Sequence, residues 1–173
     1  MKINYYALKA IYLHEMDRFR RTLTQSLLSP VLTTSLYFIV FGSVIGGYVE
    51  KIDGISYGSY IVPGLLMLTL LTQSISNTSF GIFFPKFNGT IYEILAAPIS
   101  TFEIVLAFVG AGATKTLVVS IVIFITSLFF VDVEVKYPFL MIFLLILVAV
   151  TFALFGFLIG LISSDFEQMS IIP

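Results

Sequence analysis

Four stretches of about twenty or more consecutive, mostly apolar residues constrain the fold of this 173-residue chain more than any other feature. They cover residues 31–49, 59–80, 103–131 and 138–163. A helix needs about 20 apolar residues to cross a bilayer core of roughly 30 Å. The two-residue alternation of a membrane β-barrel is absent. We therefore expect an all-α integral membrane protein with four transmembrane helices.

The composition supports this expectation and excludes several other classes of protein. Charged residues make up 11% of the chain, against about 25% in soluble domains. The net charge of -1 argues against a basic nucleic-acid-binding protein. The absence of Cys and the single His14 leave no thiolate or His-based metal site. The first thirty residues are too polar for a cleavable signal peptide, so we expect the first spanning helix to act as the insertion signal.

Residues 3–28 have a different pattern, that of an amphipathic helix. Apolar side chains recur there at spacings of three and four: Leu8, Tyr12, Met16, Phe19, Leu23 and Leu27. Asp17 and Arg21 are four residues apart and could form an ion pair. We expect an interfacial helix lying along the membrane surface, with a helix packed on the protein as the alternative. Ser29 and Pro30 then fit the N-cap and first turn of the first span.

The distribution of basic residues predicts the orientation of the chain in the membrane. One orientation places six basic residues in the cytoplasm: Lys2, Lys9, Arg18, Arg20, Arg21 and Lys86. It leaves only Lys51 and Lys136 outside. Because cytoplasmic loops are enriched in Lys and Arg, we expect a cytoplasmic N-terminus. The loops at residues 50–57 and 132–136 are then external, and the segment 83–100 is cytoplasmic.

Polar side chains inside the second span are candidates for a transport pathway or for a helix interface. These side chains fall within about 140° of the helix circumference at 100° per residue, and they are Thr69, Thr72, Gln73, Ser76 and Asn77. Such groups should face another helix or a wet path rather than lipid.

Lys115 lies within the third span, where a charged side chain costs roughly 2.5–3.5 kcal/mol on insertion scales. It could act in a pathway or proton relay. Alternatively, it could extend to the headgroups or pair with a polar group on another helix. The glycines before Lys115 do not have the spacing of a nucleotide-binding loop, so we expect no nucleotide site and no catalytic residue in the chain.

Between the second and third spans, residues 86–97 predict a short helix with its own start and end. Gly89 permits a tight entry and Pro98 ends the helix. Ile91, Ile94 and Leu95 would form its apolar face, with Glu93 opposite. The following Ser100 and Glu103 have the spacing of a capping box that opens the third span. A simple loop needs no such helix, so the pattern favours a docking surface.

These motifs together resemble the ABC-2 type permease family, the membrane subunits of ATP-binding-cassette exporters. The amphipathic helix and first span resemble the family at Glu15, Arg18, Arg21 and Pro30. The second span does so at Tyr60, Pro63 and Gly64. The cytoplasmic loop matches at Gly89, Thr90, Glu93, Leu95, Pro98, Ser100 and Glu103.

The resemblance implies that segment 86–97 is a coupling helix, and that the loop residues just named contact a separate ATPase subunit. ATP and Mg would be held by that partner, with no cofactor in this chain. It further implies a second permease copy or a homologue, a bacterial inner-membrane location, and export of a drug, lipid-linked saccharide or polysaccharide. Family members usually have more spans, so residues 1–173 are expected to be one incomplete permease domain, with a fifth span beginning near Phe166.

Two other classes of function stay open on the sequence. One is an ion-coupled secondary transporter or channel component that uses Lys115 and the polar face formed by Thr69, Gln73, Ser76 and Asn77. Inverted repeats would support it, and the sequence shows none. The other is a purely structural membrane subunit. Dependence on a partner ATPase would separate the exporter from both.

Overall fold

The computed structural model describes residues 4–45, 51–52, 55–131, 133 and 135–171. The helices are α1 (Tyr5–Arg21), α2 (Leu23–Tyr37), α3 (Tyr57–Phe87), α4 (Ile91–Ala96), α5 (Thr101–Ser127), α6 (Pro138–Ile162) and α7 (Phe166–Ile171). A π-helical segment, η1 (Phe38–Ile45), continues α2. Two-residue strands, β1 (Lys51–Ile52) and β2 (Ile55–Ser56), pair antiparallel before α3.

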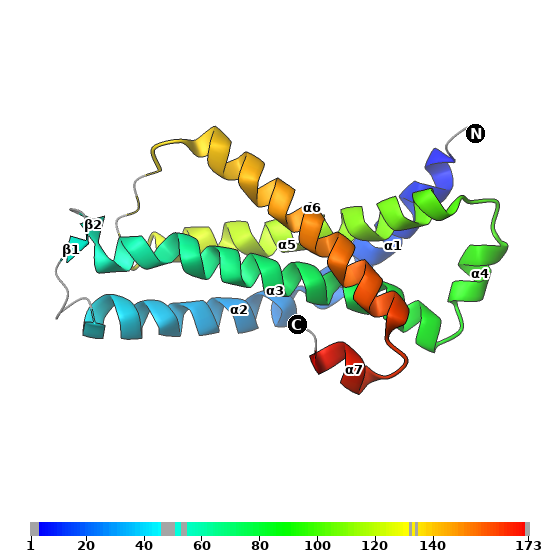
Figure 1. Ribbon diagram of the computed structural model, residues 1–173, viewed down its shortest axis with the longest axis horizontal. Helices are drawn as coiled ribbons and strands as arrows, with labels where there is room; N and C mark the ends of the chain where they lie inside the picture. The colour runs from blue at the N-terminus through cyan, green and yellow to red at the C-terminus, as the bar shows by residue number, and fades with distance from the viewer. Residues whose placement is uncertain (1–3, 46–50, 53–54, 132, 134, 172–173) are drawn as a thin grey trace.

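Four of the described helices are long and apolar enough to cross a membrane: Leu23–Phe41, α3, α5 and α6. This confirms the all-α membrane fold. In Figure 1, α2, α3 and α5 run along the long axis of the molecule, and α6 crosses them obliquely. The β1–β2 pair is a local feature of the connection between the first and second spans, within the loop predicted at 50–57.

The start of the first span differs from the prediction. The helix predicted at 3–28 is interrupted at Thr22, and the next helix begins at Leu23. The Thr22 hydroxyl donates to the carbonyls of Arg18 and Phe19, at 3.2 and 3.4 Å. Such side-chain bonds compete with the regular helical pattern and favour a break. Pro30 is buried inside α2 rather than in its first turn, and Ser29 is therefore not its N-cap.

The other spans agree with the prediction in place but differ in their ends. α3 continues seven residues beyond the predicted end at residue 80, and its 31 residues give a length of about 46 Å. α5 ends at Ser127 rather than at 131, whereas α6 matches its predicted span within one residue at the C-terminal end. A short helix, α7, does begin at Phe166, whose ring packs on Phe83 and Phe87 of α3.

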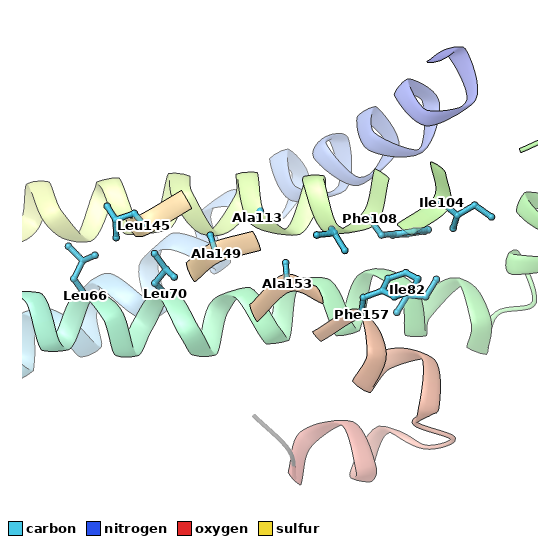
Figure 2. Close-up of a cluster of buried hydrophobic side chains, with 11 residues drawn as sticks. Leu66, Leu70, Ile82, Ile104, Phe108, Ala113, Leu145, Ala149, Ala153 and Phe157 are labelled. Atoms are coloured by element: carbon cyan, nitrogen blue, oxygen red, sulfur yellow. The ribbon is translucent and has the colours of Figure 1, made fainter. Parts of the chain in front are cut away.

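The main core forms where α3, α5 and α6 meet, as Figure 2 shows. Leu70, Ala149 and Ala153 are fully buried there. Two glycines let α6 approach α3 closely. A Cβ added at Gly156 or Gly160 would lie 2.5 or 2.4 Å from a backbone oxygen of α3. Such distances are far below van der Waals contact. The close packing of α6 on α3 therefore requires glycine at both positions.

α1 packs along α5 through a face that is only partly the predicted one. Phe19 is buried and Met16 packs beside it, as the apolar pattern predicts. The carboxylate of Glu15 is buried at the centre of the same face. Among the described residues, the two ion pairs present both involve Glu15, so the expected pair between Asp17 and Arg21 does not form.

Candidate functional site

The first candidate site is the connection between α3 and α5, which contains α4. The chain leaves α3 at Asn88 and turns at Gly89, whose φ of 79° lies in the left-handed region that favours glycine. Thr90 then precedes α4, and its carbonyl accepts the N–H of Glu93 at 3.1 Å. The tight entry predicted for Gly89 is therefore present.

α4 is seated on the protein by one side and free on the other. Ile91 and Ile94 pack against the main core, as predicted. Tyr92 and Leu95 are 73% and 62% exposed, and Glu93 is exposed as well. The prediction that Leu95 helps to seat the helix is wrong, because its side chain stays exposed while Ile91 and Ile94 contact the core. The outward surface is thus an aromatic ring, a carboxylate and an aliphatic side chain.

The exit from α4 is fixed by a capping box, as the sequence predicts. Ser100 Oγ accepts the N–H of Glu103 at 3.4 Å, and a carboxylate oxygen of Glu103 accepts the N–H of Ser100 at 2.7 Å. Glu103 also accepts the backbone N–H of Asn4, and the Asn4 amide donates to the carbonyl of Pro98 at 3.3 Å. Because Glu103 is buried, it can influence a docked partner only by positioning α4 and α5.

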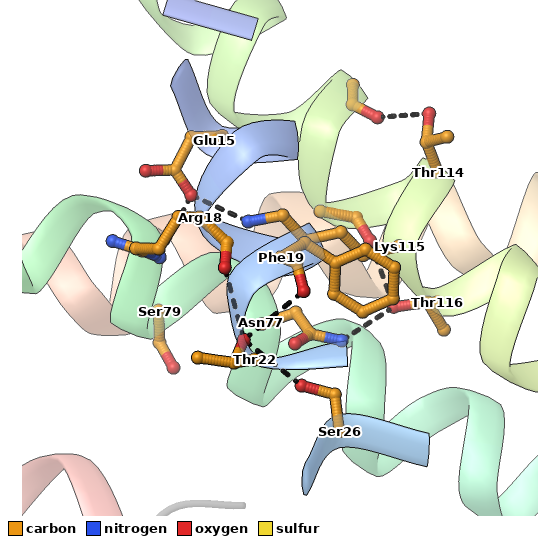
Figure 3. A network of polar contacts seen from close by, with 12 residues as sticks. Glu15, Arg18, Phe19, Thr22, Ser26, Asn77, Ser79, Thr114, Lys115 and Thr116 are labelled. Atoms are coloured by element: carbon orange, nitrogen blue, oxygen red, sulfur yellow. Dashed lines mark hydrogen bonds and ion pairs between the residues drawn. The ribbon is translucent and has the colours of Figure 1, made fainter. Parts of the chain in front are cut away.

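The second candidate site is a buried ion pair between α1 and α5. Lys115 Nζ donates to Glu15 Oε2 at 2.7 Å, and both side chains are almost fully buried. Arg18 Nη2 lies 2.9 Å from the same oxygen, with about a third of its side chain exposed. Figure 3 shows Glu15 meeting both cations. Of the alternatives for Lys115, the structure thus shows pairing with a neighbouring helix.

The polar residues predicted along the second span make separate sets of hydrogen bonds. Asn77 turns to α5, where its amide donates to Thr116 at 3.4 Å, and it lies 3.5 Å from the Gln73 side chain. Thr69 donates to a carbonyl of its own helix. Ser76 is half-buried, and its carbonyl accepts the hydroxyl of Ser79. The structure therefore brings Asn77 close to Lys115, while the hydrogen bonds of Thr69 and Ser76 stay within α3.

Sequence reasoning missed three contacts of these sites. Glu15 was singled out by resemblance alone, although its spacing from Phe19 and Tyr12 places it on the packed face. The link from Asn4 to the start of α5 had no sequence signal, because 99 residues separate Asn4 and Glu103. Ser74, which donates to the carbonyl of Ala149 at 2.6 Å, also went unnoticed.

Comparison with known proteins decides between the classes of function that the sequence left open. Residues 6–173 match the family model described as ABC-2 type transporter. The chain belongs to the ABC-2 type transporter family. It is therefore the transmembrane part of an ABC transporter, and family membership argues against the ion-coupled secondary transporter.

Curated relatives agree with this family. The chain is 39% identical over 173 residues to proteins named inner membrane transport permease YadH, from Escherichia coli K12, Escherichia coli O157:H7 and Shigella flexneri. Each alignment covers 100% of this chain and 68% of the relative. No solved structure matches the chain.

Proposed function

We propose that this chain is the permease subunit of a bacterial inner-membrane ABC exporter, and that α4 docks into a separate ATPase subunit. ATP and Mg would bind to that ATPase. The exported cargo would be amphipathic: a drug, a lipid-linked saccharide or a polysaccharide. The names of the relatives support the inner-membrane location and the transport role.

The observation that carries this proposal is the two-sided character of α4. A loop that only joined two spans would not need a helix seated by Ile91 and Ile94 on the core. The same six residues leave Tyr92, Glu93 and Leu95 facing outward. An exposed aromatic ring suits the core of a protein–protein interface, and the carboxylate beside it suits the polar rim.

The flanks of α4 would pass a push from the ATPase to the membrane helices. Ser100 and Glu103 fix the start of α5 through reciprocal hydrogen bonds. Asn4 ties the beginning of α1 to Pro98 and Glu103. Displacement of α4 would therefore move α1 and α5 together, which is the kind of rigid linkage that a switch between inward- and outward-facing states requires. A second permease copy or homologue would complete the pathway.

The test is co-purification of the full-length subunit with its ATPase, together with ATP-dependent transport into inside-out vesicles. Glu93→Lys and Leu95→Asp should weaken binding, since each places an unmatched charge in the interface, and such a mismatch costs on the order of several kcal/mol. Gly89→Leu should uncouple transport by distorting the left-handed turn. Lys136→Glu, a charge reversal at an exposed position far from α4, is the matched control and should bind normally. If the Glu93, Leu95 and Gly89 variants all bind the ATPase and transport normally, the segment is only a loop.

A further inference from the structure

A pocket of about 450 Å³ lies beside the buried ion pair, at the break between α1 and α2. Arg18, Thr22 and Ser26 line it from the first two helices, and Lys115 lines it from α5. Its volume falls within the usual range of small-molecule sites, roughly 300–1,000 Å³. No residue of α4 is among those that line the pocket.

The charges around this pocket favour an anion. Two cations, Arg18 and Lys115, line the pocket, whereas their shared partner Glu15 is not among the lining residues. The charges of Arg18, Lys115 and Glu15 sum to +1 if all three groups are ionised. Each cation has donors beyond the one directed at Glu15, since a guanidinium has five N–H groups and an ammonium has three. The hydroxyls of Thr22 and Ser26 add further polar groups at the same place.

Helix α3 adds apolar side chains to the lining of the pocket. Phe80 and Phe84 of α3 line it, and they are 47% and 46% exposed. The helix α3 ends at Phe87. Phe84 lies three residues before this end, and Asn77 lies ten residues before it. At 1.5 Å per residue the pocket therefore lies within about 15 Å of the end of α3 that leads into α4. A ligand here would have its charged group among cations and an apolar part against phenylalanine rings.

We infer that this pocket binds the phosphate headgroup of an anionic membrane lipid, with its acyl chains lying along Phe80 and Phe84. The guanidinium of Arg18 would donate to the phosphate from the exposed side, and the ammonium of Lys115 would reach it from the buried side. A forked guanidinium is well suited to phosphate oxygens. This inference does not depend on the docking of an ATPase.

Native mass spectrometry of the full-length subunit in a neutral detergent tests the inference, with phosphatidylglycerol as the anionic probe and phosphatidylcholine as the zwitterionic one. Retention of phosphatidylglycerol should exceed that of phosphatidylcholine. Arg18→Gln should lower it about tenfold, as expected for losing one charge-assisted hydrogen bond. Arg20→Gln removes the same charge from an exposed position on the same helix and should have little effect.

A second pair of variants tests the pocket without changing charge. Ser26→Met should fill the pocket and lower lipid retention, whereas Thr24→Met, at an exposed position on α2, should not. A thermal melt of each variant confirms that it is folded. Equal retention of the two lipids, or equal effects of Arg18→Gln and Arg20→Gln in folded protein, would overturn the inference. Displacement of the lipid by millimolar inorganic phosphate would do so too, because it would show a site for a free anion.

Discussion

Breaking the buried pair between Glu15 and Lys115 should destabilise the membrane domain by an amount that depends on which partner is removed. Glu15→Met leaves the ammonium of Lys115 buried without a carboxylate. Removing one partner of a buried ion pair typically costs about 3–5 kcal/mol. A central Lys alone costs roughly 2.5–3.5 kcal/mol on insertion scales. We therefore expect Glu15→Met to lower the free energy of unfolding by about 3 kcal/mol.

Lys115→Met should cost less, because Glu15 keeps Arg18 as a partner at 2.9 Å. The substitution removes one charged hydrogen bond, worth about 1.5–3 kcal/mol, but also removes the desolvation cost of a buried ammonium. We expect a net loss of about 1 kcal/mol and retained transport. The double variant should resemble Lys115→Met, giving a coupling energy of about 2–3 kcal/mol between the two residues.

Equilibrium unfolding in SDS, followed by far-UV circular dichroism, measures these differences in the full-length subunit. Arg20→Gln is the control, since Arg20 is exposed on α1 and takes no part in the pair of Glu15 with Lys115 and Arg18. Exposed substitutions usually change stability by less than about 0.5 kcal/mol. The reasoning is refuted if Glu15→Met falls within that range, or if the two single losses simply add in the double variant.

Two further predictions concern packing and topology. Gly156→Ala should destabilise the protein by about 1–3 kcal/mol in the same SDS titration, because its Cβ would meet the backbone of α3, whereas Gly64→Ala has open space and should be nearly neutral. For topology, a Cys placed at Ser56 should be labelled by a membrane-impermeant reagent from outside, and one placed at Ala96 only from the cytoplasm. Labelling of the Ser56 position from the cytoplasm alone would reverse the proposed orientation.

Much of the fold could be predicted because lipid imposes a strong pattern on the sequence. The apolar stretches identified the four spans, and the capping box of Ser100 and Glu103 identified the start of α5. The break at Thr22 could not be predicted, because apolar spacing continues unchanged through residues 19–27 and Pro30 offered a stronger local signal. The structure tolerates Pro30 within α2, where neighbouring helices bury it.

The sites were less predictable, because their partners are remote in the chain. Nothing near Lys115 indicates that its carboxylate lies 100 residues earlier in α1. The apolar spacing likewise predicted that Leu95 packs on the protein. This was wrong because six residues are too few to define one apolar face. Only the three-dimensional packing of Ile91 and Ile94 shows which side of α4 remains outward.

Photo-crosslinking from α4 tests the central proposal, that this helix docks into an ATPase. p-Benzoylphenylalanine would replace Tyr92, which is 73% exposed on α4, in the full-length subunit co-expressed with its ATPase. The matched control replaces Tyr60, which is 56% exposed near the other end of α3. We predict a covalent adduct with the ATPase from position 92 and none from position 60. Equal adducts from both positions, or no adduct from position 92 while the two subunits co-purify, would contradict the proposal.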